Sequence, residues 1–498
     1  MAAADFPEMT PAELRAAFWR VFPSVALAIM LGAVDQTLVA TALPAIAAEF
    51  GALERITWVM VAYLVAATIA APVFGRLADA FGRRRLLLVG LVLHALGALL
   101  CALAGGFGLL VVARMVQGAG GAALTTLTMA LIGEALPPRE RGRFQAYIAT
   151  CFVLASSAGP LAGGWLSEGW GWRACFWTLL PVQGLAFALA WRLPRRAPPE
   201  AGAPFSFDWA GVLLFAGFVA PTLLAFGQVQ RLSAQALPIA FFLAVAAVAA
   251  LFLLWCQERS ARHPLLPLGL LAQPAIWKAD LLSGLVHGAF VSLVTFLPIY
   301  LQTARGLGAS AAGALLVPFS IGGFLGGMLA GQTMTRTGMA MILPGFGLPI
   351  AALLLVGAAV FADSLPNLGL ALLFGLAALG MATHYPVVQI TVQVAAGPAR
   401  LGAAAASVQF ARSLGAAVAT ALLGALLFGS LAAHDAEAAS LFARLVREGA
   451  GLLPSLPEAA RAVLAEGMAS GFRAAFLGAA VLVALGAVLA WRAPTQRI

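Results

Sequence analysis

The segment GRLADAFGRRR, residues 75 to 85, places five charged residues in a short gap between two long apolar stretches. These stretches lie near residues 56–78 and 86–105, and each is long enough to cross a bilayer as a helix, which takes about 20 apolar residues. Gly75 and Gly82 flank the first charges and permit a tight turn. The segment therefore predicts a short charged loop between two transmembrane helices.

The composition extends this prediction to all 498 residues. Hydrophobic residues make up 62% of the chain and charged residues only 10%, which excludes an ordinary soluble enzyme. Apolar windows recur fourteen times and predict an all-α polytopic membrane protein with fourteen transmembrane helices. The windows lie near residues 21–43, 56–78, 86–105, 107–132, 144–167, 174–192, 208–227, 236–256, 275–302, 310–333, 339–361, 366–390, 401–430 and 472–491.

Two linkers rich in proline and charge divide these windows into six, two and six. The predicted parts are an N-terminal segment (1–20), a six-helix bundle (21–192), linkers with two additional helices (193–274), a second six-helix bundle (275–491) and a tail (492–498). The second bundle contains one long extracytoplasmic loop, residues 431–471. Residues 438–449 and 457–467 of this loop carry helical apolar spacing, so we expect helices there, either at the membrane interface or in solvent.

The distribution of cations predicts the orientation. Nineteen of the twenty-nine lysines and arginines fall on the side that carries both termini, which indicates cytoplasmic termini. The net charge of +9 then reflects topology and attraction to anionic lipid rather than nucleic-acid binding. The four cysteines lie in or beside apolar windows without metal-site spacing, and residues 1–20 do not read as a cleaved signal.

An internal repeat links the two six-helix blocks. GRLADAFG (75–82) follows the second window of the first block, and GQTMTRTG (331–338) follows the second window of the last block. Both glycines match, whereas Thr335 replaces Asp79. Repeated halves favour a transporter whose site lies between two rocking bundles.

Seven segments carry a family resemblance: VDQTLVATALPAI (34–46), GRLADAFGRRR (75–85), ARMVQGAGGA (113–122), PPRERGRFQA (137–146), SAGPLAGGWL (157–166), WRACFW (172–177) and SVQFARSLGAA (407–417). Over residues 20 to 492 the chain resembles major facilitator superfamily transporters, and among them the 14-helix drug:proton antiporters of the multidrug exporter type. The resemblance implies two bundles that rock to alternate access, with no cofactor.

The resemblance implies a cytoplasmic gate around the first quoted segment, formed by Gly75, Asp79, Gly82, Arg83, Arg84 and Glu134. Asp79 can accept hydrogen bonds from a helix N-terminus or pair with an arginine. We expect Glu134 to pair with Arg83 or Arg84 when the gate is closed in the outward-facing state. In the simpler alternative the arginines only fix topology.

The fifth window carries the motif that the family associates with antiporters, with Gly159, Pro160, Gly163 and Gly164. Small residues permit close helix packing, and proline interrupts the hydrogen-bond ladder, so this helix can bend and slide. Close packing alone, without a role in antiport, is the alternative.

Charges inside the membrane mark candidate proton-coupling residues, because each costs several kcal/mol unless it is paired or hydrated. Asp35 and Arg114 lie within the first and fourth windows, and the resemblance places both toward the central cavity. Asp35 is the leading candidate for proton exchange. In the alternative the two form a permanent ion pair, and protons pass through Asp280 and His287, seven residues apart in the ninth window.

Polar and aromatic residues in other windows are candidates to line the substrate cavity, which in such proteins is mainly apolar with a few polar anchors. They are Gln36, Trp58, Gln117, Gln389, Gln393, Gln409 and Arg412. Arg412 either lines this cavity or bonds backbone carbonyls. One buried acid and two buried arginines leave the charge of the substrate open.

The sequence lacks a P-loop and an HExxH motif, so neither ATP-driven transport nor metalloprotease activity is expected. The predicted function is proton-coupled export of lipophilic drugs or similar amphiphiles, with protons, a lipophilic substrate and membrane lipid as partners. Together with the resemblance, this predicts a monomer in a bacterial inner membrane without a metal; a periplasmic adaptor is an alternative that is not favoured. The alternatives are a dedicated exporter or importer of one metabolite, and a membrane sensor or scaffold that does not transport.

Overall fold

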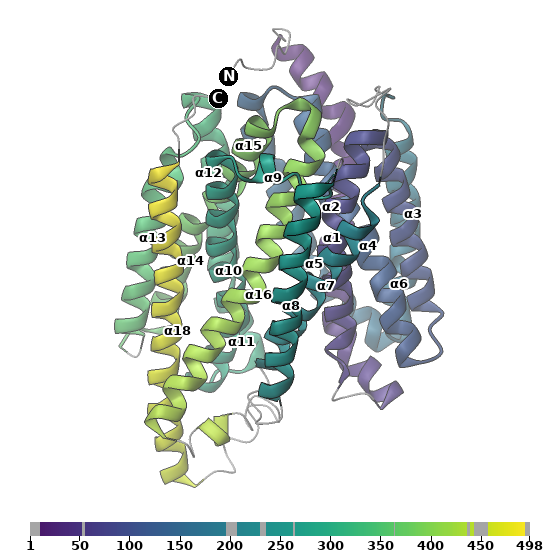
Figure 1. The fold of residues 1–498 in the computed structure, drawn as a ribbon. Coiled ribbons are helices and arrows are strands. Elements are labelled where there is room, and N and C mark those ends of the chain that lie inside the picture. Colours follow the sequence, from purple (N-terminus) through teal and green to yellow (C-terminus); the bar gives the residue numbers. More distant parts are fainter. Residues whose placement is uncertain are drawn as a thin grey trace.

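Long helices lying roughly side by side make up the molecule (Figure 1). The structure is a computed structural model that describes residues 10–51, 55–195, 207–229, 236–261, 264–362, 364–435, 439–442 and 457–493. The first group of helices comprises α1 (Pro11–Phe50), α2 (Trp58–Phe81), α3 (Arg83–Ala102), α4 (Phe107–Ala135), α5 (Pro138–Trp170), α6 (Arg173–Trp191), α7 (Trp209–Val229) and α8 (Ala236–Ser260). The second comprises α9 (Leu268–Leu271), α10 (Pro274–Thr303), α11 (Ala309–Leu315), α12 (Val317–Thr337), α13 (Ile342–Phe361), α14 (Asn367–Ala382), α15 (His384–Ala396), α16 (Leu401–His434) and α18 (Glu458–Arg492).

The prediction of an all-α polytopic membrane protein is confirmed. Within the described residues, thirteen helical segments are long and apolar enough to cross a membrane. The remaining predicted window, 144–167, lies inside α5, whose 33 residues are also sufficient to span a bilayer. The helix count is thus consistent with the fourteen that hydropathy predicts.

Two predicted helices are interrupted. The window at 310–333 is divided at Leu316 between α11 and α12, and the window at 366–390 is divided at Thr383 between α14 and α15. Each break precedes a proline, Pro318 or Pro386, which has no backbone N–H to donate to the carbonyl four residues earlier. The interruption therefore has a local cause that hydropathy does not register.

Two hydrophobic cores divide the helices into two bundles. One core runs from Phe18 to Leu193 through α1 to α6, and the other from Leu270 to Ala493 through α9 to α18. A smaller cluster around Phe215 packs α7 against α2 and α16, so the additional helix pair covers a seam between the bundles.

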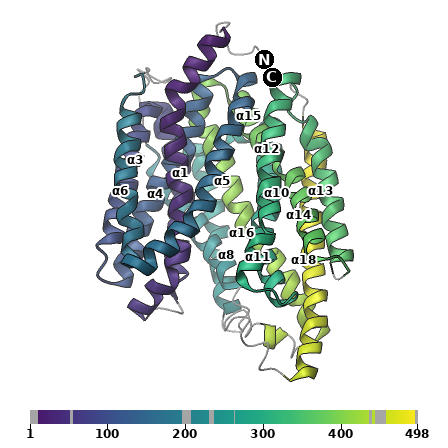
Figure 2. The ribbon, with the colours of Figure 1, turned by 180° about the vertical axis from the view of Figure 1, so that it is seen from behind.

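The bundles meet tightly at the end where both termini lie, hereafter the terminal end (Figures 1 and 2). A Cβ on Gly402 of α16 would lie 2.3 Å from the carbonyl oxygen of Gly75 on α2, and one on Gly331 of α12 would lie 2.1 Å from that of Gly142 on α5. Only glycine permits such close approach of two backbones. In the part of the chain that the structure describes, every hydrogen bond between the bundles lies at this end.

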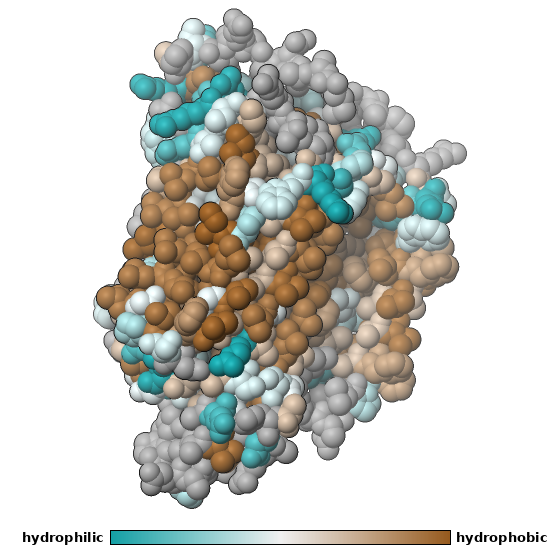
Figure 3. Space-filling view, turned by 90° about the vertical axis from the view of Figure 1, so that its left-hand side faces the viewer, coloured by the Kyte–Doolittle hydropathy of each residue, from teal (hydrophilic) through white to brown (hydrophobic). Residues whose placement is uncertain are grey.

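The outer surface has the character of a membrane protein. Figure 3 shows an apolar band between two more polar ends, on the side of α13 and α18. Large apolar side chains stay exposed along the helices, including Leu213 (72% exposed), Phe242 (71%) and Leu353 (71%). Such exposure is unfavourable in water and favourable against lipid chains.

The structure differs from expectation in the loop at 431–471. Residues 458–467 do not form a separate surface helix, because α18 begins at Glu458 and continues without interruption to Arg492. Of the other expected helix, residues 439–442 are helical, and residues 443–449 lie outside the described part of the chain.

Candidate functional site

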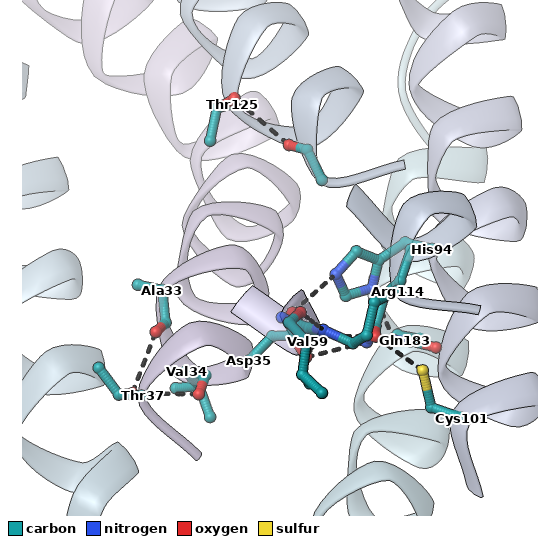
Figure 4. Close-up of polar contacts among 12 residues, drawn as sticks. Ala33, Val34, Asp35, Thr37, Val59, His94, Cys101, Arg114, Thr125 and Gln183 are labelled. Carbon is teal, nitrogen blue, oxygen red and sulfur yellow. Dashed lines mark hydrogen bonds and ion pairs between the residues drawn. The ribbon is translucent and has the colours of Figure 1, made fainter. Parts of the chain in front are cut away.

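A buried ion pair joins α1 to α4. Arg114 Nη1 donates to both carboxylate oxygens of Asp35, at 3.0 and 2.9 Å, and both residues are 0% exposed (Figure 4). Gln117, one helical turn after Arg114, donates to Asp35 at 2.9 Å and accepts from Arg114 at 2.8 Å. The pair is therefore neutral as a whole, and removing either charge leaves the other uncompensated inside the protein.

A histidine lies beside this pair. His94 on α3 is 0% exposed, and its Nε2 is 4.0 Å from the Asp35 carboxylate. Its Nδ1 accepts a hydrogen bond from the Gln183 side-chain amide of α6 at 2.8 Å, so the proton of a neutral His94 is on Nε2, the nitrogen that faces Asp35. The Tyr63 ring stacks on the Arg114 guanidinium, 4.4 Å from its carbon. Four helices thus converge on Asp35.

The second bundle holds a different cluster around Arg412 of α16. Arg412 Nε donates to the Ser283 hydroxyl of α10 at 3.1 Å, and Nη2 donates to the Tyr385 carbonyl of α15 at 3.2 Å. The Tyr385 hydroxyl is hydrogen-bonded to His287 Nδ1. Asp280 lies one turn before Ser283 on α10, yet no ion pair between Arg412 and a carboxylate is found in the described residues. Asp280 and His287 are seven residues apart on α10, about 10 Å at the usual rise of a helix, which is too far for a direct hydrogen bond between helix-anchored side chains of this length.

The predicted gate residues meet at the terminal end. The Asp79 carboxylate accepts from the backbone N–H groups of Gly402 and Ala403, in the first turn of α16, at 2.9 and 3.0 Å. Asp79 thus bonds the N-terminus of a helix in the other bundle, where the helix dipole favours an anion.

Arg83 extends the same contact. It donates to Asp79 at 3.1 Å, to Glu134 at 2.8 Å and to the Pro398 carbonyl of the other bundle at 2.9 Å. Arg84, by contrast, donates to the Trp191 carbonyl within its own bundle. Glu134 therefore pairs with Arg83 and not with Arg84.

Gln393, a predicted cavity residue, instead joins the bundles at the terminal end. It accepts from Arg141 of α5 at 3.2 Å and donates to the Met129 carbonyl of α4 at 3.0 Å. Burial and the nearby Arg83 lower the pKa of Arg141 to about 10, so its guanidinium stays charged at neutral pH. The partners of Gln393 fill the space between α4, α5 and α15. Gln393 itself is therefore only 3% exposed.

The other predicted cavity residues have diverse positions. Gln117 does not line a cavity in this structure, because it is 0% exposed and both its amide atoms bond the buried ion pair. Gln389 is 4% exposed, and its amide nitrogen has no hydrogen-bond partner. Trp58 is exposed at the start of α2, at the end opposite the gate. Gln36 is exposed in the middle of α1, and Gln409 is partly exposed on α16.

Glycines of α5 pack against threonines of α1. A Cβ on Gly159 would lie 1.8 Å from the Thr37 hydroxyl, and one on Gly163 would lie 2.2 Å from the Thr41 hydroxyl. A Cβ on Gly164 would meet nothing within 4 Å. Pro160 lies in α5 with its side chain outside the described part. Two of the three motif glycines thus permit close contact between α5 and α1.

Several residues of these clusters are not apparent from the sequence. Gln183, Tyr63, Tyr385 and Ser283 are ordinary members of apolar windows, and nothing local marks them as partners of a charge. His94 is the exception, because a histidine in the middle of a very apolar window is itself a signal.

Comparison with known proteins identifies the family. The Major Facilitator Superfamily profile matches residues 25–420. An uncharacterized MFS-type transporter of Mycobacterium tuberculosis is 30% identical over 94% of this chain and 68% of its own length. The efflux pump dotC of Dothistroma septosporum is 33% identical over 66% of this chain and 59% of its length. The multidrug transporter protein MdtP of Bacillus subtilis is 28% identical over 80% and 74%.

Solved structures agree on the fold. The human organic anion transporter MFSD10 superposes with a TM-score of 0.63 at 17% identity, covering 97% of this chain and all of that protein. At this identity the likeness concerns the fold alone. Together with the profile match, it confirms the resemblance and excludes an enzyme: the chain belongs to the major facilitator superfamily of membrane transporters.

Proposed function

We propose that the protein is a proton-coupled antiporter that exports lipophilic or amphiphilic compounds by alternating access. The observation that carries this proposal is the Asp35–Arg114 pair, a titratable carboxylate held without exposure inside a transporter bundle. The names of two relatives, an efflux pump and a multidrug transporter, support export.

The proton step follows from the chemistry of the pair. When Asp35 is ionised, Arg114 and Gln117 hold it and tie α1 to α4. A proton on Asp35 removes the negative charge that compensates Arg114, so the contact between the helices weakens. The neutral imidazole of His94 presents its Nε2–H to the carboxylate from 4.0 Å and so favours the ionised form of Asp35. Proton binding would in this way change how α1 packs on α4.

The contacts at the terminal end support the proposed direction of transport. We assign the terminal end to the cytoplasm of a bacterium, because most of the cations lie there. The contacts of Asp79 and Arg83 with the other bundle then represent a closed cytoplasmic face, as in an outward-facing state. Close packing of α5 on α1 would transmit a shift of α1, the helix that carries Asp35, to α5, which contacts α12 at Gly331.

We further propose the division into bundles at 21–192 and 275–491, with the pair α7 and α8 between them. The proposed unit is a monomer without a periplasmic adaptor. Its partners are protons, lipid and a small lipophilic substrate.

Substrate-dependent proton flux in inverted membrane vesicles tests this proposal. Vesicles with an acidic interior receive a cationic, a neutral or a carboxylate amphiphile, and a pH-sensitive dye reports the loss of the gradient. Wild type should dissipate the gradient with at least one amphiphile, and Asp35→Asn with none. Glu168→Gln, which changes an exposed carboxylate of α5, is the matched control and should behave as wild type.

Equal flux in Asp35→Asn and wild type would remove Asp35 from proton coupling and direct attention to Asp280 and His287. If wild type gave no proton flux with any of the amphiphiles while transporting one of them, the antiport mechanism would be wrong.

A further inference from the structure

We propose that Arg412 binds the anionic group of the substrate, so that the transporter takes amphiphiles bearing a carboxylate. The proposal deepens the export function above and rests on it for its physiological role, whereas binding itself can be measured without transport. Four features of the cluster around Arg412 carry it.

The first feature is the charge balance. Arg114 is neutralised by Asp35 at 2.9 Å, but the hydrogen-bond partners of Arg412 among the described residues are neutral, the Ser283 hydroxyl and the Tyr385 carbonyl; Asp280 attracts Arg412 from a distance without forming an ion pair with it. A cation inside a membrane protein is costly without a counter-ion. An anionic ligand would supply the missing charge.

The second feature is the unused hydrogen-bonding capacity of Arg412. A guanidinium has five N–H groups, and within the described part of the chain Arg412 donates two of them to protein. Its Nη1 is not among the buried atoms that lack a partner, unlike Nη2 of Arg114. The free edge of Arg412 is therefore accessible, and this edge is the one that binds a carboxylate in a bidentate manner.

The third feature is the combination of depth and exposure. Arg412, His287 and Tyr385 are densely surrounded by protein, yet each keeps partial exposure. Side chains with both properties line internal space rather than a packed core. Arg412 lies ten residues after Gly402, about 15 Å along α16 from the gate at the usual rise of a helix. This depth favours a soluble amphiphile over the headgroup of a lipid.

The fourth feature is the helix break at Thr383, which adds polar groups to the cluster. Because Pro386 interrupts the helix, α15 begins at His384 and presents Tyr385 to Arg412, with the ring centre 4.8 Å from the guanidinium carbon. His384 is 0% exposed, and its Nε2 has no hydrogen-bond partner. Discontinuous helices commonly form the substrate sites of transporters, because they free backbone polar groups.

Asp280 is the carboxylate to consider as a competitor. It lies one turn before Ser283 on α10, and one of its oxygens is buried without a hydrogen-bond partner. If Arg412 serves a ligand, then removing the charge of Asp280 should strengthen carboxylate binding. If the ligand does not contact Arg412, the same change should leave carboxylate binding as it was.

The test compares two probes that differ in one charge, 11-(dansylamino)undecanoic acid and its methyl ester. Purified protein in a nonionic detergent at pH 7.5 is titrated with each, and dansyl fluorescence reports binding. We expect wild type to bind the acid about tenfold or more tightly than the ester, the size of one charge-assisted hydrogen bond. Arg412→Gln should bind both equally, with the affinity for the ester unchanged.

Three further variants sharpen the result. Arg412→Lys should retain part of the preference for the acid, and Asp280→Asn should increase it. Arg336→Gln, which removes an exposed cation at the terminal end, is the control for general attraction of anions and should match wild type. A melting curve for each variant shows that it is folded.

Equal binding of acid and ester by wild type, or a preference that survives in Arg412→Gln, would overturn the proposal. The outcome is separable from that of the vesicle experiment. A preserved preference without proton flux would remove antiport and keep the anion site, whereas proton flux without any preference would remove only the anion site.

Discussion

Among the described residues, Arg114 of the first bundle and Arg412 of the second lie deep among the helices, and the two bundles accommodate them in different ways. Arg114 is 0% exposed and paired with Asp35, whereas Arg412 keeps partial exposure and, within the described part of the chain, bonds a hydroxyl and a carbonyl. Full burial requires a counter-charge, while access to water or a ligand allows a cation to remain unpaired. The comparison distinguishes a buried, neutralised charge pair from a charge that a binding partner can reach.

The contacts that the two halves make at the terminal end also differ. In the first half Asp79 bonds the N-terminus of α16 directly. In the second half the equivalent Thr335 bonds only its own helix, through the Gly331 carbonyl at 3.0 Å, and its backbone carbonyl accepts from Arg139 at 2.9 Å. At the terminal end, the first half contacts the other bundle through the charged side chain of Asp79. The second half does so through the backbone carbonyl of Thr335.

The largest effect on stability is expected for breaking the buried pair of Asp35 and Arg114. Asp35→Asn leaves Arg114 buried without a counter-charge and should lower the free energy of unfolding by about 3–5 kcal/mol. The double variant Asp35→Asn with Arg114→Gln removes both charges and should recover most of that loss. Thermal unfolding in detergent measures both. A double variant as unstable as Asp35→Asn would show that the charge imbalance is not the cause.

The next effect concerns the two gates. Asp79→Asn weakens charge-assisted bonds to α16 and should shift the equilibrium toward opening of the terminal end by about 2 kcal/mol. Thr335→Val should shift it little, because the hydroxyl bonds only within α12. Spin labels at the exposed positions Arg85 and Arg336 report the distance between the bundles. Arg84→Gln is the control, and equal shifts in both gate variants would contradict the asymmetry.

A smaller effect on stability is expected for the neutral hydrogen-bond partners of the two arginines, Gln117 for Arg114 and Ser283 for Arg412. Gln117→Met removes both hydrogen bonds to the buried pair, where no water can replace them, and should lower the free energy of unfolding by about 1–3 kcal/mol. Ser283→Ala removes one bond to the accessible Arg412 and should cost less than about 1 kcal/mol, because water can substitute. Chemical unfolding of both variants tests the order, and the reverse order would contradict our account of their environments.

The smallest effect on stability is expected for Arg412→Gln. The change removes a charge that lacks a counter-ion, so the loss of its two hydrogen bonds is offset and the free energy of unfolding should change by no more than about 1 kcal/mol. The melting temperature compared with that of wild type and Arg114→Gln provides the measurement. A loss as large as that of Arg114→Gln would indicate that Arg412 is a structural residue.

The order and approximate bounds of the helices follow from the sequence because a membrane-spanning helix satisfies its backbone hydrogen bonds within one local segment. Each predicted window therefore coincides with observed helix, although hydropathy does not reveal the breaks at Leu316 and Thr383. The charged segment at 75–85 also marks a loop between two helices by itself, because five charges in so short a segment are costly inside the apolar layer.

Tertiary structure decided which polar groups meet where the sequence left alternatives open, as for Asp35 with Arg114 and for Glu134 with Arg83 or Arg84. Asp35 and Arg114 are 79 residues apart, and Gln393 reaches Arg141 across 252 residues. The sequence placed Gln117 and Gln393 in a cavity because an amide in an apolar window looks the same whether it lines water or bonds a buried partner. That distinction depends on how the helices rotate and pack against one another, which hydropathy does not encode. The same packing left Arg412 without an ion pair among the described residues and placed His94 beside Asp35.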